Sequence, residues 1–394
     1  MNNFEFYNPV KIVFGEGVLN GIGAEAKQHG KKAMIVSYTD VSFFGDLFTN
    51  IAASLKQSGV DSVEYFAATA NPTIAQAQGG IEICKKNDID MVIGVGGGSA
   101  MDCAKVIAAG VMYDHDLTKM ISFSHSDDSQ IPPTQALPII MVPTLPATGS
   151  EMNPTAVITD EKTHSKSYVW APECLFAKSA FVDPSLAKTL PAYQTACGAL
   201  DTISHTLESY FNGEPGLNLD LQDRLQEGLV KTVIDNLPKV LENGLDIQTR
   251  GVMQWASALA LNGWVLTGTY TWAPMHQFGH ILSTRYEATH GAALSVIMIA
   301  FLKFFSKHAD NARYVQFADR LFGTSLEKAT VTFEKLVSDS GIQTRISEFG
   351  GKADDIDMLV DDIVRISFNA DGVLGSVPAL SKDEVKEIFT IAMA

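Results

Sequence analysis

The sequence of 394 residues has few cysteines, few basic residues and no long uninterrupted apolar run. Its four cysteines form no C-x-x-C pair, as expected for reduced thiols in a cytoplasm: Cys84, Cys103, Cys174 and Cys197. Lysine and arginine number 29 against 45 acidic residues, and the resulting net charge of −16 disfavours nucleic acids and anionic membranes as partners. The acidic surface therefore indicates solubility and identifies no partner.

Export and membrane insertion are also disfavoured. No charged and apolar leader opens the chain at MNNFEFYNP. Residues 252–268 are uncharged, but polar residues interrupt this run, and it is shorter than the roughly 20 apolar residues of a membrane span. We expect a buried helix there, and a cytoplasmic protein.

Hydrophobic patterning divides the chain near residue 190. Before that point, short apolar strands alternate with helical stretches, which is typical of an open α/β sheet; the strands are KIVFG, AMIVSY, SVEYF, MVIGV, LPIIMVP and SAFVD. Beyond it, almost every long segment has helical spacing. The sequence predicts a Rossmann-like α/β domain, residues 1–190, followed by an all-α domain, residues 191–394.

The helical half carries candidate metal ligands. Asp201 and His205 lie four residues apart in ACGALDTISHTLESYF, so both side chains leave the same helix face. His276 and His280 have the same spacing in MHQFGH, and His290 follows. One carboxylate with imidazoles suits Fe(II), Zn(II), Co(II) or Ni(II) and argues against calcium or magnesium. The spacing leaves open whether His276 or His280 completes the set.

A candidate nucleotide site lies upstream. The apolar run IDMVIGV, 89–95, reads as a strand buried on both faces, and the helix that follows begins near Ser99. Gly96, Gly97 and Gly98 therefore lie between strand and helix, where backbone N–H groups and the helix dipole bind a diphosphate. Neither G-x-G-x-x-G nor the P-loop pattern is present. The turn in MVPTLPATGSE, 141–151, offers further hydroxyls and backbone donors.

These motifs together resemble the iron-containing (group III) alcohol dehydrogenase family, in its butanol dehydrogenase-like aldehyde reductase branch. The resemblance covers essentially the whole chain, from FGEG through GGGSAMD, TLPATGSE, FVDPSLAKTLP and ALDTISHTLE to HQFGH and THG. It implies the two-domain architecture shared with dehydroquinate synthases. It also implies an NAD(P)-linked alcohol dehydrogenase or aldehyde reductase that acts on small or medium primary alcohols and aldehydes as a homodimer.

The resemblance also implies roles for individual residues. The metal, Fe(II) in preference to Zn(II) or Ni(II), would be held by Asp201, His205, His276 and His290, and His280 would lie beside the nicotinamide. The cofactor would be contacted by Tyr38, Gly97, Gly98, Ser99, Asp102, Thr144, Leu145, Thr148 and Lys166. Many NAD-preferring members have an acidic residue where Tyr38 stands, so we expect NADP(H) to be favoured, although Asp40 is close enough to restore the lost repulsion.

A divalent ion facing a nicotinamide suits reversible hydride transfer between an alcohol and an aldehyde. We expect His280 to relay the proton, since imidazole titrates near neutrality, and Glu208 to orient a metal-bound imidazole. Four aromatic residues are candidates for a substrate wall, although aromatic residues of helical domains more often lie in the core: Trp170, Trp264, Trp272 and Phe278.

Other functions remain open at this stage. Glycerol dehydrogenases and dehydroquinate synthases share the plan, but their polyol or carboxylate substrates call for several basic residues, and the segments with candidate ligands contain few apart from Arg285. A third possibility is a sensor that binds metal and nucleotide without turnover, which an assay of cofactor oxidation with butanal would distinguish.

Overall fold

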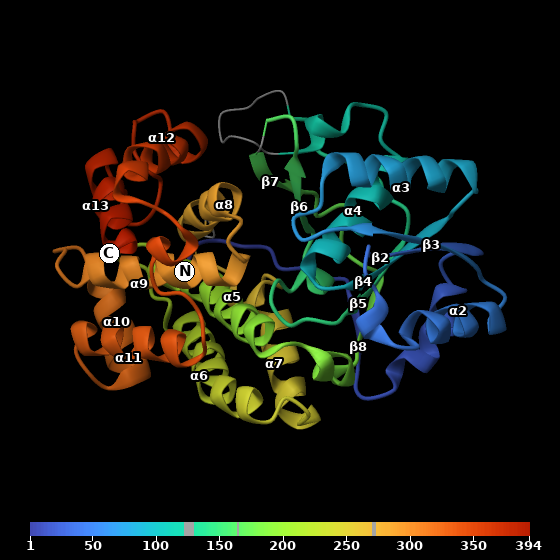
Figure 1. The fold of residues 1–394 in the computed structure, drawn as a ribbon, viewed down its shortest axis with the longest axis horizontal. Helices are drawn as coiled ribbons and strands as arrows, with labels where there is room; N and C mark the ends of the chain where they lie inside the picture. The colour runs from blue at the N-terminus through green and yellow to red at the C-terminus, as the bar shows by residue number, and fades with distance from the viewer. Residues whose placement is uncertain (122–129, 164, 270–272) are drawn as a thin grey trace.

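The computed structural model describes residues 1–121, 130–163, 165–269 and 273–394 of the chain. A parallel sheet with its helices forms the N-terminal part, and helices form the C-terminal part (Figure 1). The predicted fold class, an α/β region followed by a helical region, is therefore confirmed. The N-terminal segment reaches back to the helical region, where the Asn2 backbone N–H donates to the Gly268 carbonyl.

Six parallel strands form the main sheet in the order β1-β8-β5-β4-β2-β3. They are β1 (Lys11–Phe14), β2 (Lys32–Tyr38), β3 (Asp61–Ala68), β4 (Met91–Gly96), β5 (Ile139–Pro143) and β8 (Ser179–Val182). Each strand coincides with one of the six predicted apolar runs. The order reverses between β2 and β4, since β3 lies beyond β2 and β5 lies beyond β4. Ligands of such sheets bind outside the carboxyl ends of the strands at this reversal.

Helices cover both faces of the sheet. They are α1 (Ile22–Ala26), α2 (Leu47–Gln57), α3 (Ile74–Lys86) and α4 (Gly98–Val111). Figure 1 shows α3 and α4 on one face and α2 on the other. Successive residues of β2 serve the two layers, because side chains alternate along a strand: Met34 packs into the core under α3 and α4, and Ile35 packs into the core that contains α1 and α2.

A β-hairpin outside the main sheet was not predicted from the sequence. Antiparallel strands β6 (Thr155–Asp160) and β7 (Ser165–Trp170) pair with Val157 opposite Tyr168. One face of the hairpin packs on α4 through Ala156 and Val169, which are buried in the same core. The other face is left for the functional site.

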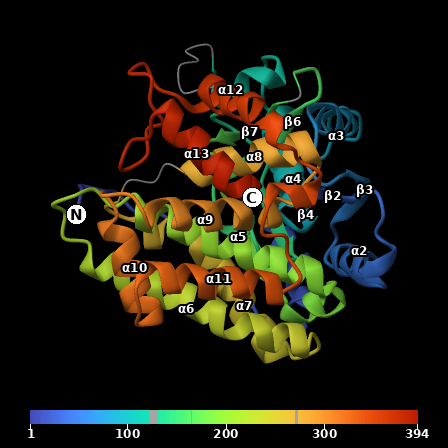
Figure 2. The same cartoon turned by 60° about the vertical axis from the view of Figure 1, so that its left-hand side comes forward.

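The C-terminal part contains α5 (Ala192–Phe211), α6 (Asp220–Glu242), α7 (Ile247–Ala260), α8 (Pro274–Tyr286), α9 (His290–Phe305), α10 (Ala312–Phe322), α11 (Leu326–Asp339), α12 (Ile356–Ser367) and α13 (Lys382–Met393). Helix α9 lies among α5, α8, α11 and α13 (Figure 2), so its sequence is apolar on all sides. Among the described residues, no helix combines the length and apolar character needed to cross a membrane.

The prediction of one buried helix over residues 252–268 was wrong in part. Helix α7 ends at Ala260, and a short 3₁₀ turn, Trp264–Leu266, follows. Gly263 has a φ of 93°, a left-handed conformation that interrupts the helix and that glycine adopts readily.

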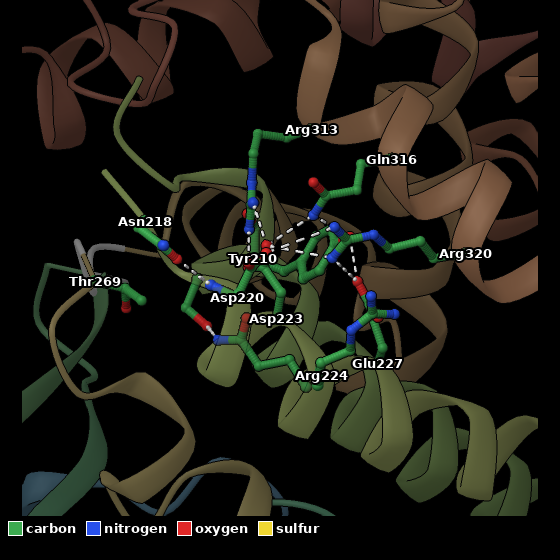
Figure 3. A network of polar contacts seen from close by, with 12 residues as sticks. Tyr210, Asn218, Asp220, Asp223, Arg224, Glu227, Thr269, Arg313, Gln316 and Arg320 are labelled. Atoms are coloured by element: carbon green, nitrogen blue, oxygen red, sulfur yellow. Dashed lines mark hydrogen bonds and ion pairs between the residues drawn. The ribbon is translucent and has the colours of Figure 1, made fainter. Parts of the chain in front are cut away.

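A buried polar network joins α5, α6 and α10 (Figure 3). The Arg313 guanidinium donates to both carboxylate oxygens of Asp223, at 2.8 and 2.7 Å. The Tyr210 hydroxyl donates to Glu227 at 2.9 Å and accepts from Gln316 at 2.8 Å. Bidentate charged pairs of this kind fix orientation, so the network holds the far end of α5, the helix that also carries Asp201.

Candidate metal and nucleotide site

A cleft of about 1230 Å³ lies between the sheet and the helical region, and residues of both line it. Every residue that the family resemblance implied as a metal ligand, a cofactor contact or the nicotinamide-side histidine lines this cleft: Tyr38, Gly97, Gly98, Ser99, Asp102, Thr144, Leu145, Thr148, Lys166, Asp201, His205, His276, His280 and His290. Gly96 and Asp40 do not. The carboxyl ends of β2 and β4 therefore face the histidines of α8 and α9.

The four candidate metal ligands come from three helices. Helix α5 supplies Asp201 and His205, α8 supplies His276, and α9 begins at His290. The Asp201 Oδ1 atom lies 3.8 Å from His205 Nδ1, 3.7 Å from His276 Nε2 and 3.8 Å from His290 Nε2. One ligand atom each from Asp201, His276 and His290 all lie within 4.8 Å of one another. Residues separated by up to 89 positions thus point their donor atoms at one place.

These donor atoms lack partners within the described chain. Asp201 Oδ1, His205 Nδ1 and His276 Nε2 are buried and make no hydrogen bond, and separations of 3.7 to 3.8 Å are too long for one. A buried polar atom without a partner costs about 1–3 kcal/mol. A divalent cation among them would satisfy all three atoms, and a carboxylate with imidazoles is a donor set that first-row ions accept. The residues therefore fit such an ion.

The electrostatics of the cluster also favour a cation. Burial lowers the pKa of His205 to about 4, and burial followed by the charge of Lys166 lowers the pKa of His290, so both imidazoles are neutral with a free lone pair. Burial alone would lower the pKa of His276, but the Glu208 and Asp201 carboxylates raise it to about 10. In the absence of a metal ion, a proton on His276 thus supplies the positive charge beside Asp201.

A close helix contact places His290. Next to it, Gly291 packs on α5 so tightly that an added Cβ would lie 2.0 Å from the Cys197 carbonyl oxygen. Any side chain at Gly291 would push the start of α9 away from α5, one turn before Asp201. In the His-Gly pair, His290 thus supplies a ligand atom, and Gly291, which has no side chain, lets the start of α9 approach α5 closely enough to place it.

His280 lies beside the cluster. Its ring centroid is 5.3 Å from that of His290 and 6.2 Å from that of His276. Both His205 and His280 lie outside the set of three residues whose ligand atoms converge, but His205 Nδ1 lies 3.8 Å from Asp201 Oδ1. Burial, followed by the nearby Lys166 charge, lowers the pKa of His280. Of the two histidines that the spacing left open, His276 is the one whose nitrogen faces Asp201.

The glycine turn has the geometry of an anion site. Strand β4 ends at Gly96, which has a φ of 147°, Gly97 is the N-cap of α4, and the helix begins at Gly98. A Cβ on Gly98 would lie 2.5 Å from Thr148 Cγ2, so the loop from β5 covers the turn closely. The Tyr38 hydroxyl accepts a hydrogen bond from the Gly97 N–H at 3.0 Å. The N–H groups at the start of α4 remain for a phosphate.

Two charged residues predicted to contact the cofactor line the cleft, Asp102 buried and Lys166 partly exposed. Burial raises the pKa of Asp102, although its carboxylate accepts hydrogen bonds from the Ser150 hydroxyl at 2.6 Å and the Val157 N–H at 2.9 Å. Lys166 projects from β7, and burial lowers the pKa of its ammonium group to about 8 against the attraction of Asp201 and Asp102.

Several cleft residues were not predicted from the sequence. The open face of the hairpin presents Thr155, Val157 and Tyr168 beside Lys166. Alternation of buried and cleft-facing residues in TAVITD and SKSYVW is the signal that could have revealed them. Of the aromatic candidates, Trp170 lines the cleft, Phe278 is core, packed against Phe301 and Phe389, and Trp264 is half exposed. Trp272 lies outside the described residues.

Family models match nearly all of the chain. The model described as iron-containing alcohol dehydrogenase matches residues 9–184, and the model described as the C-terminal part of the Fe-containing alcohol dehydrogenase family matches residues 195–393.

Individual relatives also match this chain over most or all of its length. The chain is 33% identical to NADH-dependent butanol dehydrogenase A of Clostridium acetobutylicum over 99% of both chains. It is 28% identical to the NADPH-dependent aldehyde reductase YqhD of Escherichia coli over 89% of this chain and 90% of the relative. The crystal structure of NADH-dependent butanol dehydrogenase A from Thermotoga maritima superposes with a TM-score of 0.91 at 32% identity, covering 100% of this chain and 99% of that one.

Proposed function

The chain belongs to the iron-containing alcohol dehydrogenase family, and on that premise we propose that Asp201, His205, His276 and His290 hold the catalytic divalent ion. The protein is an NAD(P)-linked alcohol dehydrogenase and aldehyde reductase. The observation that carries the proposed ligand set is the convergence of buried, unpaired donor atoms on Asp201 Oδ1, inside the cleft that the glycine turn also lines.

In the proposed chemistry, the metal ion and the dinucleotide have one set of roles and residues of the chain have another. When bound, the ion would supply Lewis-acid chemistry toward the substrate oxygen, and the dinucleotide would supply or accept the hydride. The backbone N–H groups of Gly98 and Ser99 hold the diphosphate at the start of α4. Lys166 balances negative charge in the buried cleft. His280 accepts or returns the alcohol proton beside His290.

We propose Fe(II) as the ion and NADP(H) as the favoured dinucleotide. Tyr38 supports the second choice, because it ends β2 without a negative charge that would repel a 2′-phosphate, while Asp40 is exposed and accepts from the Ser42 N–H. The names of the relatives divide between NADH and NADPH. We therefore base the proposed preference for NADP(H) on Tyr38 alone.

We also propose a domain boundary, a cellular compartment and an oligomeric state for this chain. We place the domain boundary between residues 190 and 191, where α5 follows the last segment of the α/β region. Four free cysteines support a reducing cytoplasm. We further propose a homodimer.

A steady-state assay tests the function. The metal-free protein is reconstituted with Fe(II) or Zn(II), and oxidation of NADPH and of NADH is recorded with a panel of linear aldehydes including butanal. We expect consumption with either ion and a higher kcat/KM with NADPH. Binding of both ligands without consumption would indicate a sensor, and equal or better use of NADH would overturn the inference from Tyr38.

A further inference from the structure

A buried lysine beneath the nucleotide turn has no role in the chemistry above. Lys105 lies on α4 with none of its surface exposed. Its ammonium group donates to the Ser150 hydroxyl at 2.9 Å, to the Asn153 carbonyl at 2.8 Å and side-chain oxygen at 3.2 Å, and to the Thr155 carbonyl at 2.7 Å. Burying an ammonium group is costly unless it is fully hydrogen-bonded, and every acceptor here belongs to the segment that follows β5.

The same lysine is connected to Asp102 on its own helix. Ser150 accepts from Lys105 and donates its hydroxyl proton to Asp102 Oδ1 at 2.6 Å, and Asp102 Oδ2 accepts from the Val157 N–H at 2.9 Å. The network thus ties α4 to the segment from Ser150 to Val157 at both ends. Removing Lys105 would leave several buried oxygens without a donor.

The loop preceding Ser150 touches both halves of the site. On one side, Thr148 lies against Gly98 of the nucleotide turn, within 2.5 Å of where a Cβ would be. On the other side, the loop packs tightly on α5 one turn before Asp201, where a Cβ on Gly198 would lie 2.2 Å from the Pro146 carbonyl oxygen. The hydroxyl of Thr202, which follows Asp201, donates to the Ala147 carbonyl at 3.5 Å. The loop therefore packs against the turn of α5 that carries a proposed metal ligand.

We propose that Lys105 is a positioning residue that couples the nucleotide turn to the metal centre through residues 147–153. By fixing Ser150 and Asn153, it sets the position of Thr148 over Gly98 and of residues 146–147 against the turn of α5 that carries Asp201. The inference rests on the proposed function only in that the turn binds the dinucleotide and Asp201 binds the ion. It requires that loss of Lys105 weakens both sites together.

Two binding titrations test this coupling without using activity. NADPH is titrated into the metal-free protein by its fluorescence, and Zn(II) is titrated into the nucleotide-free protein against a chromophoric chelator. In Lys105→Met we expect both dissociation constants to rise by about tenfold or more, as for other groups that orient a metal ligand. In Ser150→Ala, which removes one link and keeps the lysine, we expect a rise of about fivefold in each.

A matched control separates positioning from general destabilisation. Ile107 is buried on the same helix and packs toward Gly80, away from the loop. Ile107→Ala should lower the melting temperature while both dissociation constants stay within about twofold of the parent values. The coupling is overturned if folded Lys105→Met keeps both affinities, if only one affinity falls, or if Ile107→Ala reproduces the losses. If Lys105→Met does not fold, Ser150→Ala decides by the same criteria. Absence of aldehyde reduction in the parent protein would contradict the proposed function and leave these titrations interpretable.

Discussion

The Glu208 carboxylate accepts two hydrogen bonds from His276, one from its backbone N–H at 2.7 Å and one from its ring Nδ1 at 2.6 Å. The second bond makes Nδ1 a donor to Glu208 and turns Nε2 toward Asp201, so a metal ion that displaced the Nε2 proton would find this nitrogen already in place. Glu208 lies two turns after Asp201 on α5, and one face of this helix thus supplies both a proposed ligand and the group that orients another. These bonds show that Glu208 holds the His276 ring, and binding of a metal ion by that ring stays a prediction.

Replacing Glu208 should weaken metal binding. In Glu208→Gln the amide cannot hold the His276 ring by the same charged bond, and we expect the dissociation constant for Zn(II) to rise by about 10–100-fold. NADPH affinity should not change. The matched control is Glu227→Gln, which removes a buried carboxylate from the network of α6 and leaves the site intact. Unaltered Zn(II) affinity in folded Glu208→Gln would contradict this role.

His280 is predicted to act on the proton and not to bind the ion. His280→Ala should retain stoichiometric metal, measured by elemental analysis, while kcat falls by about 10²-fold or more, the usual contribution of a general acid or base. Complete loss of metal in this variant would show instead that His280 is a ligand.

Gly291 is predicted to be essential for the position of His290. A Cβ at this residue would lie 2.0 Å from the Cys197 carbonyl oxygen, and neither backbone can yield without moving α9 from α5. We expect Gly291→Ala to lower both Zn(II) affinity and melting temperature. Gly228→Ala serves as the control, since no atom lies within 4 Å of its added Cβ on helix α6, and it should be neutral or stabilise by up to about 1 kcal/mol. Equal metal affinity in the two variants would refute the prediction.

Acid sensitivity should depend on Glu384 at the start of α13. Burial would raise its pKa, but hydrogen bonds from Ser381, at 2.7 Å to the N–H and 2.6 Å to the hydroxyl, and from the His308 ring hold the pKa below the ordinary 4.5. A carboxylate with a lowered folded-state pKa contributes its full stability above 4.5 and loses it as pH falls through the lowered value. Glu384→Gln should therefore reduce the fall in unfolding free energy, measured by urea denaturation, between neutral pH and about pH 3. Glu387→Gln, in an exposed position of α13, controls for the loss of one charge; an acid dependence in Glu384→Gln as steep as in the parent would contradict the prediction.

The sequence predicted those parts of the molecule whose signals are local. Buried parallel strands are continuous apolar runs, and all six were found, together with the turn at Gly96 to Ser99. The hairpin was missed because TAVITD and SKSYVW are short and mix polar with apolar residues. The hairpin also depends on contacts with α4 and α8, which are distant in the sequence. The break after Ala260 was missed because Gly263 was read within an uncharged run.

The site shows the same division between local and distant information. Spacing of four placed Asp201 beside His205, and His276 beside His280, because helix geometry is local. Spacing alone could not choose between His276 and His280, since the choice depends on Glu208 and Asp201, which come from α5. The tight contact of Gly198 with the Pro146 carbonyl joins segments more than 50 residues apart and left no pattern in the sequence.

The most direct test of the proposed metal centre is a titration of the metal-free protein with Fe(II) under anaerobic conditions, recording NADPH oxidation by butanal. The rate should rise from background to a plateau when one ion per chain has bound, and Asp201→Asn should bind NADPH normally yet stay at background over the same range. Full activity of the metal-free protein, or of Asp201→Asn, would contradict a catalytic ion held by Asp201, His205, His276 and His290.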